Sequence, residues 1–134
     1  MNRRYSREHG MKLLFGLDFS DGSPEEMLEN YIENNQIDME KIDMEYLKDI
    51  INGVTENKGE IDKAIEKNLS NWKIERISKV DLAILRLCVY EILYKNDIPN
   101  KVSVNEAINL SKKYSGAKSP SFINGVLGKF FEKE

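Results

Sequence analysis

The chain contains 134 residues, of which 40% are hydrophobic and 32% are charged. These values suit one globular domain with its own core, and the apolar runs are too short for a membrane span or a secretory signal. A single cysteine cannot form an internal disulfide, and with only one histidine it argues against a zinc site. We therefore expect a cytoplasmic protein without a metal or cofactor.

Apolar residues recur at helical spacing from the N-terminal region onward. Ser6 is the expected N-cap of a first helix that ends between Phe19 and Gly22, and residues 1–5 are expected to form a flexible basic arm. Ser23 is the expected cap of a second helix, with a proline in its first turn and a glutamate at its third position. The predicted apolar faces contain Met11, Leu14 and Phe15 in the first helix and Met27, Leu28, Tyr31 and Ile32 in the second.

A third and a fourth helix are predicted before the middle of the chain. Asp43 is the expected cap of the third, and helical spacing resumes at Glu60 for the fourth. A short connector then carries Trp72, Ile74 and Ile77. The predicted apolar positions are Leu47, Ile50, Ile51 and Val54 in the third helix and Ile61, Ala64, Ile65 and Leu69 in the fourth.

The strongest helical pattern runs from Ser78 to about Asn96. Ser78 with Asp81 has the spacing of a capping box, in which each side chain bonds the backbone of the other residue. The apolar positions, which include Cys88, spread over more than one face. A helix of this kind is buried on several sides, so we predict that it is the central one.

Two further helices complete the predicted fold. Ser103 and Glu106 have capping-box spacing for a helix that reaches Tyr114, and Ser119-Pro120 begins the last helix. Gly125 lies within an apolar helical stretch, where glycine is unfavourable, and a close approach of two helices would explain it. The sequence therefore predicts an all-α fold: a compact single domain over residues 1–134 with about six or seven helices.

Charge is distributed unevenly, although the net charge is only −3. Residues 1–12 carry +3, from Arg3, Arg4, Arg7 and Lys12 against one glutamate, and residues 101–134 also carry +3. Residues 13–100 carry −9. This pattern suits a protein that binds a polyanion with one surface and a basic partner with another, although solvated helix faces alone would produce it too.

No arrangement of residues in the sequence indicates catalysis. Cys88 falls at a core position, where a thiol behaves as a small hydrophobic group, and His9 has no partner at a suitable spacing. The glycines form no phosphate-binding loop. We predict that the protein is not an enzyme.

Four segments of the C-terminal half stand in a specific order and spacing. They are Leu85-Arg86-Leu87 with Tyr90-Glu91, Asp97-Ile98-Pro99, Asn105-Glu106-Ala107, and Phe122-Ile123-Asn124-Gly125. Together with Arg3-Arg4-Tyr5-Ser6-Arg7-Glu8, they resemble the NusB family of bacterial transcription antitermination factors. The resemblance covers nearly the whole chain. No single segment is specific, but four in register are.

The resemblance implies a protein that binds the boxA element of ribosomal RNA leader transcripts and acts without catalysis. It also implies a partner, the small-subunit ribosomal protein NusE, and action on an RNA polymerase elongation complex that contains other Nus factors. The RNA-binding residues that it implies are Arg3, Arg4, Arg7, Lys12, Phe15, Lys118 and Phe122. Asp81 and Glu91 are the candidates for the acidic surface that meets NusE.

Three positions depart from the family pattern, and two other functions stay open. Phe15 stands where many members have tyrosine, Lys118 where some have an acidic residue, and Gly128 where an aspartate is frequent. A related helical domain also occurs in ribosomal RNA cytosine methyltransferases, although no methyltransferase domain follows within these 134 residues. The other alternative is a homodimeric protein-interaction module, because some family members form dimers that cover the arginine region.

Overall fold

The computed structural model describes residues 1–70 and 73–131, which form seven α-helices, one short 3-10 helix and no strand. The all-α prediction and the predicted number of helices are confirmed. Trp72 lies outside the described residues. The elements in chain order are α1 (Arg3–Leu17), α2 (Pro24–Asn34), α3 (Met44–Glu56), α4 (Lys58–Lys67), η1 (Ile74–Arg76), α5 (Lys79–Tyr94), α6 (Asn100–Tyr114) and α7 (Ser119–Gly128).

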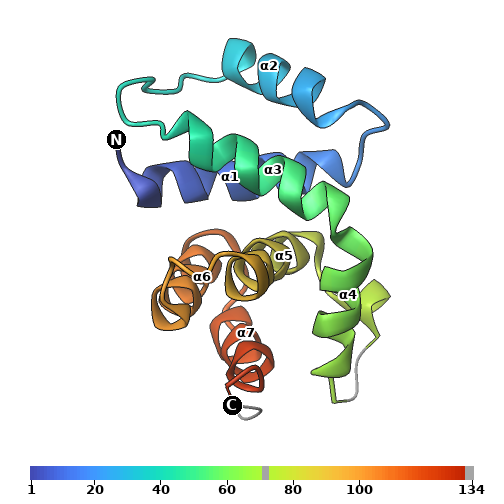
Figure 1. The fold of residues 1–134 in the computed structure, drawn as a ribbon. Coiled ribbons are helices and arrows are strands. Elements are labelled where there is room, and N and C mark those ends of the chain that lie inside the picture. The colour runs from blue at the N-terminus through green and yellow to red at the C-terminus, as the bar shows by residue number, and fades with distance from the viewer. Residues whose placement is uncertain (71–72, 132–134) are drawn as a thin grey trace.

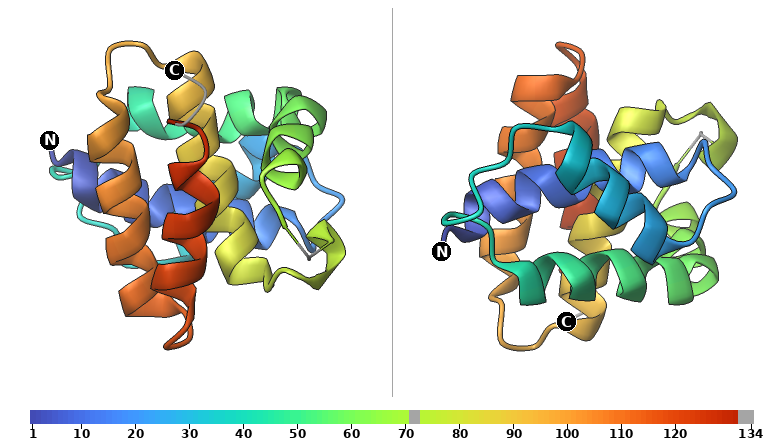
Figure 2. Two further views of the ribbon diagram at one scale, coloured as in Figure 1. Left: turned by 90° about the horizontal axis from the view of Figure 1, so that it is seen from below. Right: turned by 90° about the horizontal axis from the view of Figure 1, so that it is seen from above.

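Helix α5 is the central element, as predicted. It packs against α1, α3, α4, α6 and α7, and every residue from Asp81 to Glu91 is buried. Figure 1 shows α1, α2 and α3 on one side of α5, α7 on the opposite side, and α6 beside α5. Figure 2 shows that α6 and α7 run beside each other along the length of α5.

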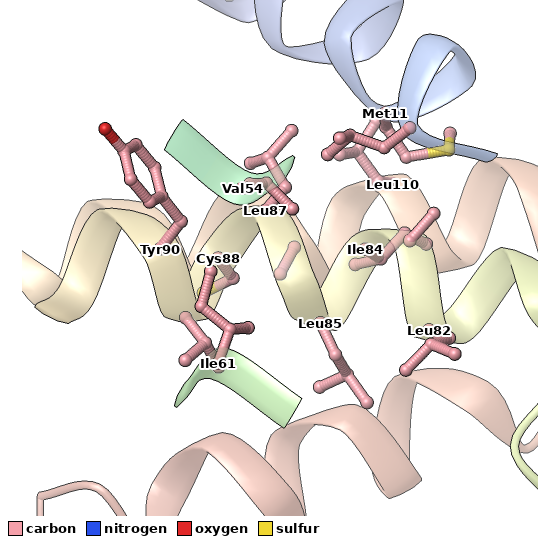
Figure 3. Close-up of a cluster of buried hydrophobic side chains, with 14 of the residues drawn as sticks. Met11, Val54, Ile61, Leu82, Ile84, Leu85, Leu87, Cys88, Tyr90 and Leu110 are labelled. Atoms are coloured by element: carbon pink, nitrogen blue, oxygen red, sulfur yellow. The ribbon is translucent and has the colours of Figure 1, made fainter. Parts of the chain in front are cut away.

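Two hydrophobic clusters hold the helices together. The larger one surrounds α5 and includes Ile84, Leu85 and Cys88, all of them fully buried (Figure 3). The smaller one joins α1, α2 and α3 through Leu13, Leu28, Leu47 and neighbouring residues. Burial of each such side chain contributes on the order of 1.5–3 kcal/mol, so most of the stability resides around α5.

Four of the predicted helix starts are confirmed. The side chains of Ser23, Asp43 and Ser78 each accept a hydrogen bond from the backbone N–H three residues later, as N-caps do. Helix α7 begins at Ser119, with Pro120 in its first turn. Helix α4 begins at Lys58, two residues before the predicted start at Glu60.

The predicted start and end of the first helix are wrong. Helix α1 begins at Arg3 with Asn2 as its N-cap, so residues 3–5 are helical and do not form a flexible arm. Ser6 lies inside the helix, where its hydroxyl accepts from the backbone N–H of Asp43 and so links α1 to the start of α3. The helix ends at Leu17, and Asp18 is its C-cap.

Both predicted capping boxes are also corrected. The carboxylate of Asp81 accepts hydrogen bonds from Ser115 and Ser119 and not from the start of its own helix. Helix α6 begins at Asn100, so Ser103 lies within it and donates to Glu91. Glu106 instead pairs with Arg4.

The close helix approach occurs at a glycine other than the predicted one. A methyl group added at Gly125 would meet no atom within 4 Å, so that prediction is wrong. At Gly53 in α3, the added carbon would lie 2.2 Å from Cζ of Tyr90. Gly53 therefore lets α3 approach α5 closely. Among the residues described, no helix is both long and apolar enough to cross a membrane.

Candidate nucleic-acid interface

The three arginines at the start of α1 point in three different directions. Arg3 turns toward α3, where it lies 3.5 Å from the carboxylate of Asp43 and 4.3 Å above the ring of Tyr46. Arg4 turns toward α6, and its side chain is 73% exposed while Nη2 lies 2.9 Å from Glu106. Arg7 turns into the core. These residues therefore do not form one basic arm.

Arg7 forms a buried ion pair with Glu91 of α5. Two of its nitrogens donate to the two carboxylate oxygens, at 2.9 and 3.1 Å. Tyr46 and Ser103 also donate to this carboxylate. Burial alone would lower the pKa of Arg7, but the hydrogen bonds that Arg7 donates to Glu91, together with the negative charges nearby, outweigh burial and raise this pKa. The Arg7 side chain is thus held in charged form inside the fold, against the paired carboxylate.

This pair contradicts two of the predicted roles. Glu91 is 0% exposed, so it is not part of an acidic surface open to a partner. Arg7 is 3% exposed and cannot reach an external phosphate in this structure. The sequence does contain a signal for this. Arg7 precedes Met11 by one helical turn and Leu14 by two, so it lies on the apolar face of α1. A buried side chain is expected on that face.

Asp81 also lies largely within the fold and is 7% exposed. Its two oxygens accept from the hydroxyls of Ser115 and Ser119, at 2.7 and 3.0 Å. The carboxylate therefore fastens the segment that joins α6 to α7 onto the start of α5. The exposed acidic surface predicted at Asp81 and Glu91 is absent.

Of the remaining predicted residues, Lys12 lies on a seam between α1 and α6. Glu8 of α1 accepts from Lys113, at 3.0 Å, and from the hydroxyl of Tyr114. Burial would raise the pKa of Glu8, but these two hydrogen bonds lower it. Nζ of Lys12 lies 5.1 Å from the centre of the Tyr114 ring, a cation–π distance. Phe15 follows Lys12 by one turn and is half-buried.

The seam continues past the end of α6 into α7. Ser115, which follows Tyr114, shares a hydrogen bond of 2.8 Å with Ser119. Exposed Lys118 directly precedes Ser119. Half-buried Phe122 follows one turn later. We call the set Arg4, Lys12, Phe15, Lys113, Tyr114, Lys118 and Phe122 the basic aromatic face.

Two shallow hollows flank Phe122. One, of about 230 Å³, has Ile77 and Phe122 on its apolar lining and Arg76 and Lys118 among its polar residues. The other, of about 270 Å³, lies between Phe122, Gly125 and Lys129 on one side and Leu69 on the other. A flat aromatic base can stack in such a hollow while the neighbouring cations bind phosphate.

Sequence reasoning did not select Arg76, Lys113 or Tyr114. The run Lys112-Lys113-Tyr114 at the end of a predicted helix was the available signal. It becomes informative only when α6 is placed beside α1, because the contacts with Glu8 and Lys12 span more than 100 residues of sequence.

Cys88 and His9, the two residues considered as catalytic groups from the sequence, are both buried. Cys88 is fully buried, and burial raises the pKa of its thiol far above the ordinary value. His9 shares a hydrogen bond of 2.6 Å with Tyr31, and its pKa is lowered chiefly by burial. Within residues 1–70 and 73–131, no group of histidine, cysteine, aspartate and glutamate side chains could hold a metal ion.

Comparison with known proteins assigns the chain to a family. A sequence model described as the NusB family matches residues 4–132. The chain belongs to the NusB family. Its similarity to "Transcription antitermination protein NusB" of Clostridium novyi (strain NT) is 55% identity over 128 residues, covering 96% of each chain. The protein of the same name from Clostridium botulinum (strain Alaska E43 / Type E3) is 54% identical over 133 residues, covering 99% of this chain and all of the relative.

Solved structures of NusB proteins have the same fold. The structure of T. maritima NusB superimposes with a TM-score of 0.87 at 34% identity, covering all of this chain and 93% of the other. A crystal structure of the antitermination factors NusB and NusE in complex with dsRNA matches with a TM-score of 0.82 at 28% identity, covering 98% of this chain and 97% of the other.

Proposed function

We propose that this NusB-family chain binds boxA RNA together with NusE and promotes read-through by RNA polymerase in ribosomal RNA operons. The basic aromatic face carries the proposal, because Lys12 of α1 lies against Tyr114 of α6 beside Lys113, and Lys118 and Phe122 follow at the start of α7. A chain of the solved NusB–NusE–dsRNA complex has the same fold, which supports RNA and NusE as partners. The protein would act by binding and not by catalysis, in the cytoplasm where bacterial transcription occurs.

Each class of residue on the face has a distinct proposed role. Lys12 and Lys118 would contact phosphates, which positions the RNA and contributes most of the affinity. Phe15 and Phe122 would stack on unpaired bases, and base edges next to them would be read by hydrogen bonds. Arg3 lies on the other side of α1, against Tyr46, and we do not place it on the face.

Arg4 and Lys113 are exposed cations that already have partners in the free protein. Arg4 is paired with Glu106 and Lys113 with Glu8. The cations of both pairs still face solvent, since the side chains of Arg4 and Lys113 are 73% and 61% exposed. An RNA phosphate can therefore replace the carboxylate as partner, and the pairing keeps both cations on the seam before RNA arrives.

Binding and transcription assays with purified components test this function. A fluorescent boxA RNA should bind the chain plus NusE more tightly than an RNA of scrambled sequence. Adding the chain to an elongation complex with NusE and the other Nus factors should increase read-through of a terminator placed after a boxA leader. Lys12→Ala/Lys118→Ala/Phe122→Ala should weaken both effects. Equal affinity for boxA and scrambled RNA, together with unchanged read-through, would contradict the proposal.

A further inference from the structure

A groove between α2 and α3 has no role in the proposed RNA contacts. It has a volume of about 420 Å³, and its floor is formed by the apolar side chains of Leu28, Ile32, Met44 and Ile51. Ile32 and Met44 are only half-buried, so apolar surface is open to an incoming side chain. Figure 1 places α2 and α3 on the side of the molecule away from α7, which carries Phe122.

The rim of this groove is acidic. Glu25 and Glu29 line it from α2, and Lys48 and Asn52 line it from α3. Helix α2 also carries Glu26 and Glu33 and no basic residue, and none of its four carboxylates forms an ion pair with any residue that the structure describes. On the seam between α1 and α6, by contrast, Glu8 and Glu106 are both paired.

We propose that the α2–α3 groove binds a basic, amphipathic helical segment of a partner protein. Apolar side chains on one face of the segment would enter the groove, as helices do in other apolar grooves. Lysine or arginine residues beside them would pair with Glu25 and Glu29. The same carboxylates repel nucleic acid and anionic lipid, so charge complementarity selects a basic protein segment. The inference does not depend on the RNA function, since the two surfaces lie on different helices.

A peptide titration of the isotope-labelled full chain, followed by NMR, tests the inference. The probe is a peptide of about 15 residues with leucines at helical spacing and lysines or arginines beside them, which is long enough to form a helix on binding. A peptide of the same composition in scrambled order is its control. The amphipathic peptide should shift the signals of residues that line the groove and leave those of Lys118 and Phe122 unchanged.

Two charge-reversal variants distinguish binding in the groove from a general effect of the protein's charge. Glu25→Lys/Glu29→Lys places two cations on the rim and should weaken binding of the amphipathic peptide about tenfold or more. Glu60→Lys/Glu66→Lys makes the same change of charge at exposed positions of α4, and should alter affinity less than about twofold. All four side chains are exposed, so the fold should tolerate both pairs of substitutions.

Three results would overturn the inference. The first is equal binding of the scrambled peptide, or equal weakening by the two variants. The second is a concentration-dependent shift of the groove signals without peptide, which would identify a second copy of the chain as the occupant. The third is a shift of these signals by boxA RNA, which would make the groove a nucleic-acid surface.

Discussion

Asp18 joins three helices through one carboxylate. As the C-cap of α1, it lies 2.9 Å from Nζ of Lys79, 3.1 Å from Nη1 of Arg86 and 3.4 Å from Nζ of Lys58. Arg86 is in turn bound through two nitrogens to Asp62 of α4. Burial would raise the pKa of Asp18, but the hydrogen bonds from Lys79 and Arg86 lower it to about 2, from an ordinary value of 3.8.

This lowered pKa predicts a loss of stability in acid. A carboxyl group with a lower pKa in the folded state stabilises the fold above its unfolded pKa, and the effect is lost as the pH falls through the folded pKa. Urea unfolding at pH 7 should show that Asp18→Asn lowers the free energy of unfolding by about 2 kcal/mol. The difference from wild type should shrink as the pH falls from about 4 toward 2. A difference that stays constant over that range would contradict the lowered pKa.

Two glycines in helices should respond to alanine in opposite ways. At Gly53 the new methyl group would collide with Tyr90, whose ring is held by a hydrogen bond to Asp49 and by stacking on Tyr94. We predict that Gly53→Ala lowers stability by about 1–3 kcal/mol. Gly125→Ala enters open space in a helix and should raise stability by up to about 1 kcal/mol. Thermal unfolding measures both, and the same sign of change at the two positions would refute the distinction.

Helices were predictable where their signals are local. Ser23, Asp43 and Ser78 mark true starts because each cap bond spans only three residues, so the pattern is complete within a short stretch of sequence. Ser6 and Ser103 look the same in sequence but lie inside helices. Their hydroxyls bond Asp43 and Glu91, which are 37 and 12 residues away. Local spacing carries no information about such partners.

The pair between Arg7 and Glu91 links α1 to α5 in the core. Removing one member leaves a buried charge without its partner, which costs about 3–5 kcal/mol. We therefore predict a loss of this size for Glu91→Leu, measured by urea unfolding. The double variant Arg7→Met/Glu91→Leu removes both charges and should be less destabilised than the single one. A double variant at least as unstable as Glu91→Leu would show that the ion pair is not what the single substitution disrupts.

Across the whole molecule, the fold was easier to predict than the site. The family resemblance selected Lys12, Phe15, Lys118 and Phe122; Lys12 lies on the seam between α1 and α6, Phe15 is one turn further along α1, and Lys118 and Phe122 lie at the start of α7. Burial could not be derived from residue type, and for this reason Arg7 and Glu91 were assigned to surfaces they do not occupy. Charged residues are rarely buried unless paired, and these two pair across 84 residues of sequence.

The central claim is that the basic aromatic face binds the RNA. The salt dependence of boxA RNA binding tests this claim most directly. The slope of log affinity against log salt concentration counts the phosphates that the protein neutralises. Arg4→Ala/Lys12→Ala/Lys118→Ala should weaken binding and reduce this slope by about 2. The control Lys48→Ala/Lys63→Ala/Lys67→Ala removes the same charge from exposed positions of α3 and α4 and should leave the slope unchanged. Equal reductions in the two triple variants, or none in the first, would place the RNA elsewhere.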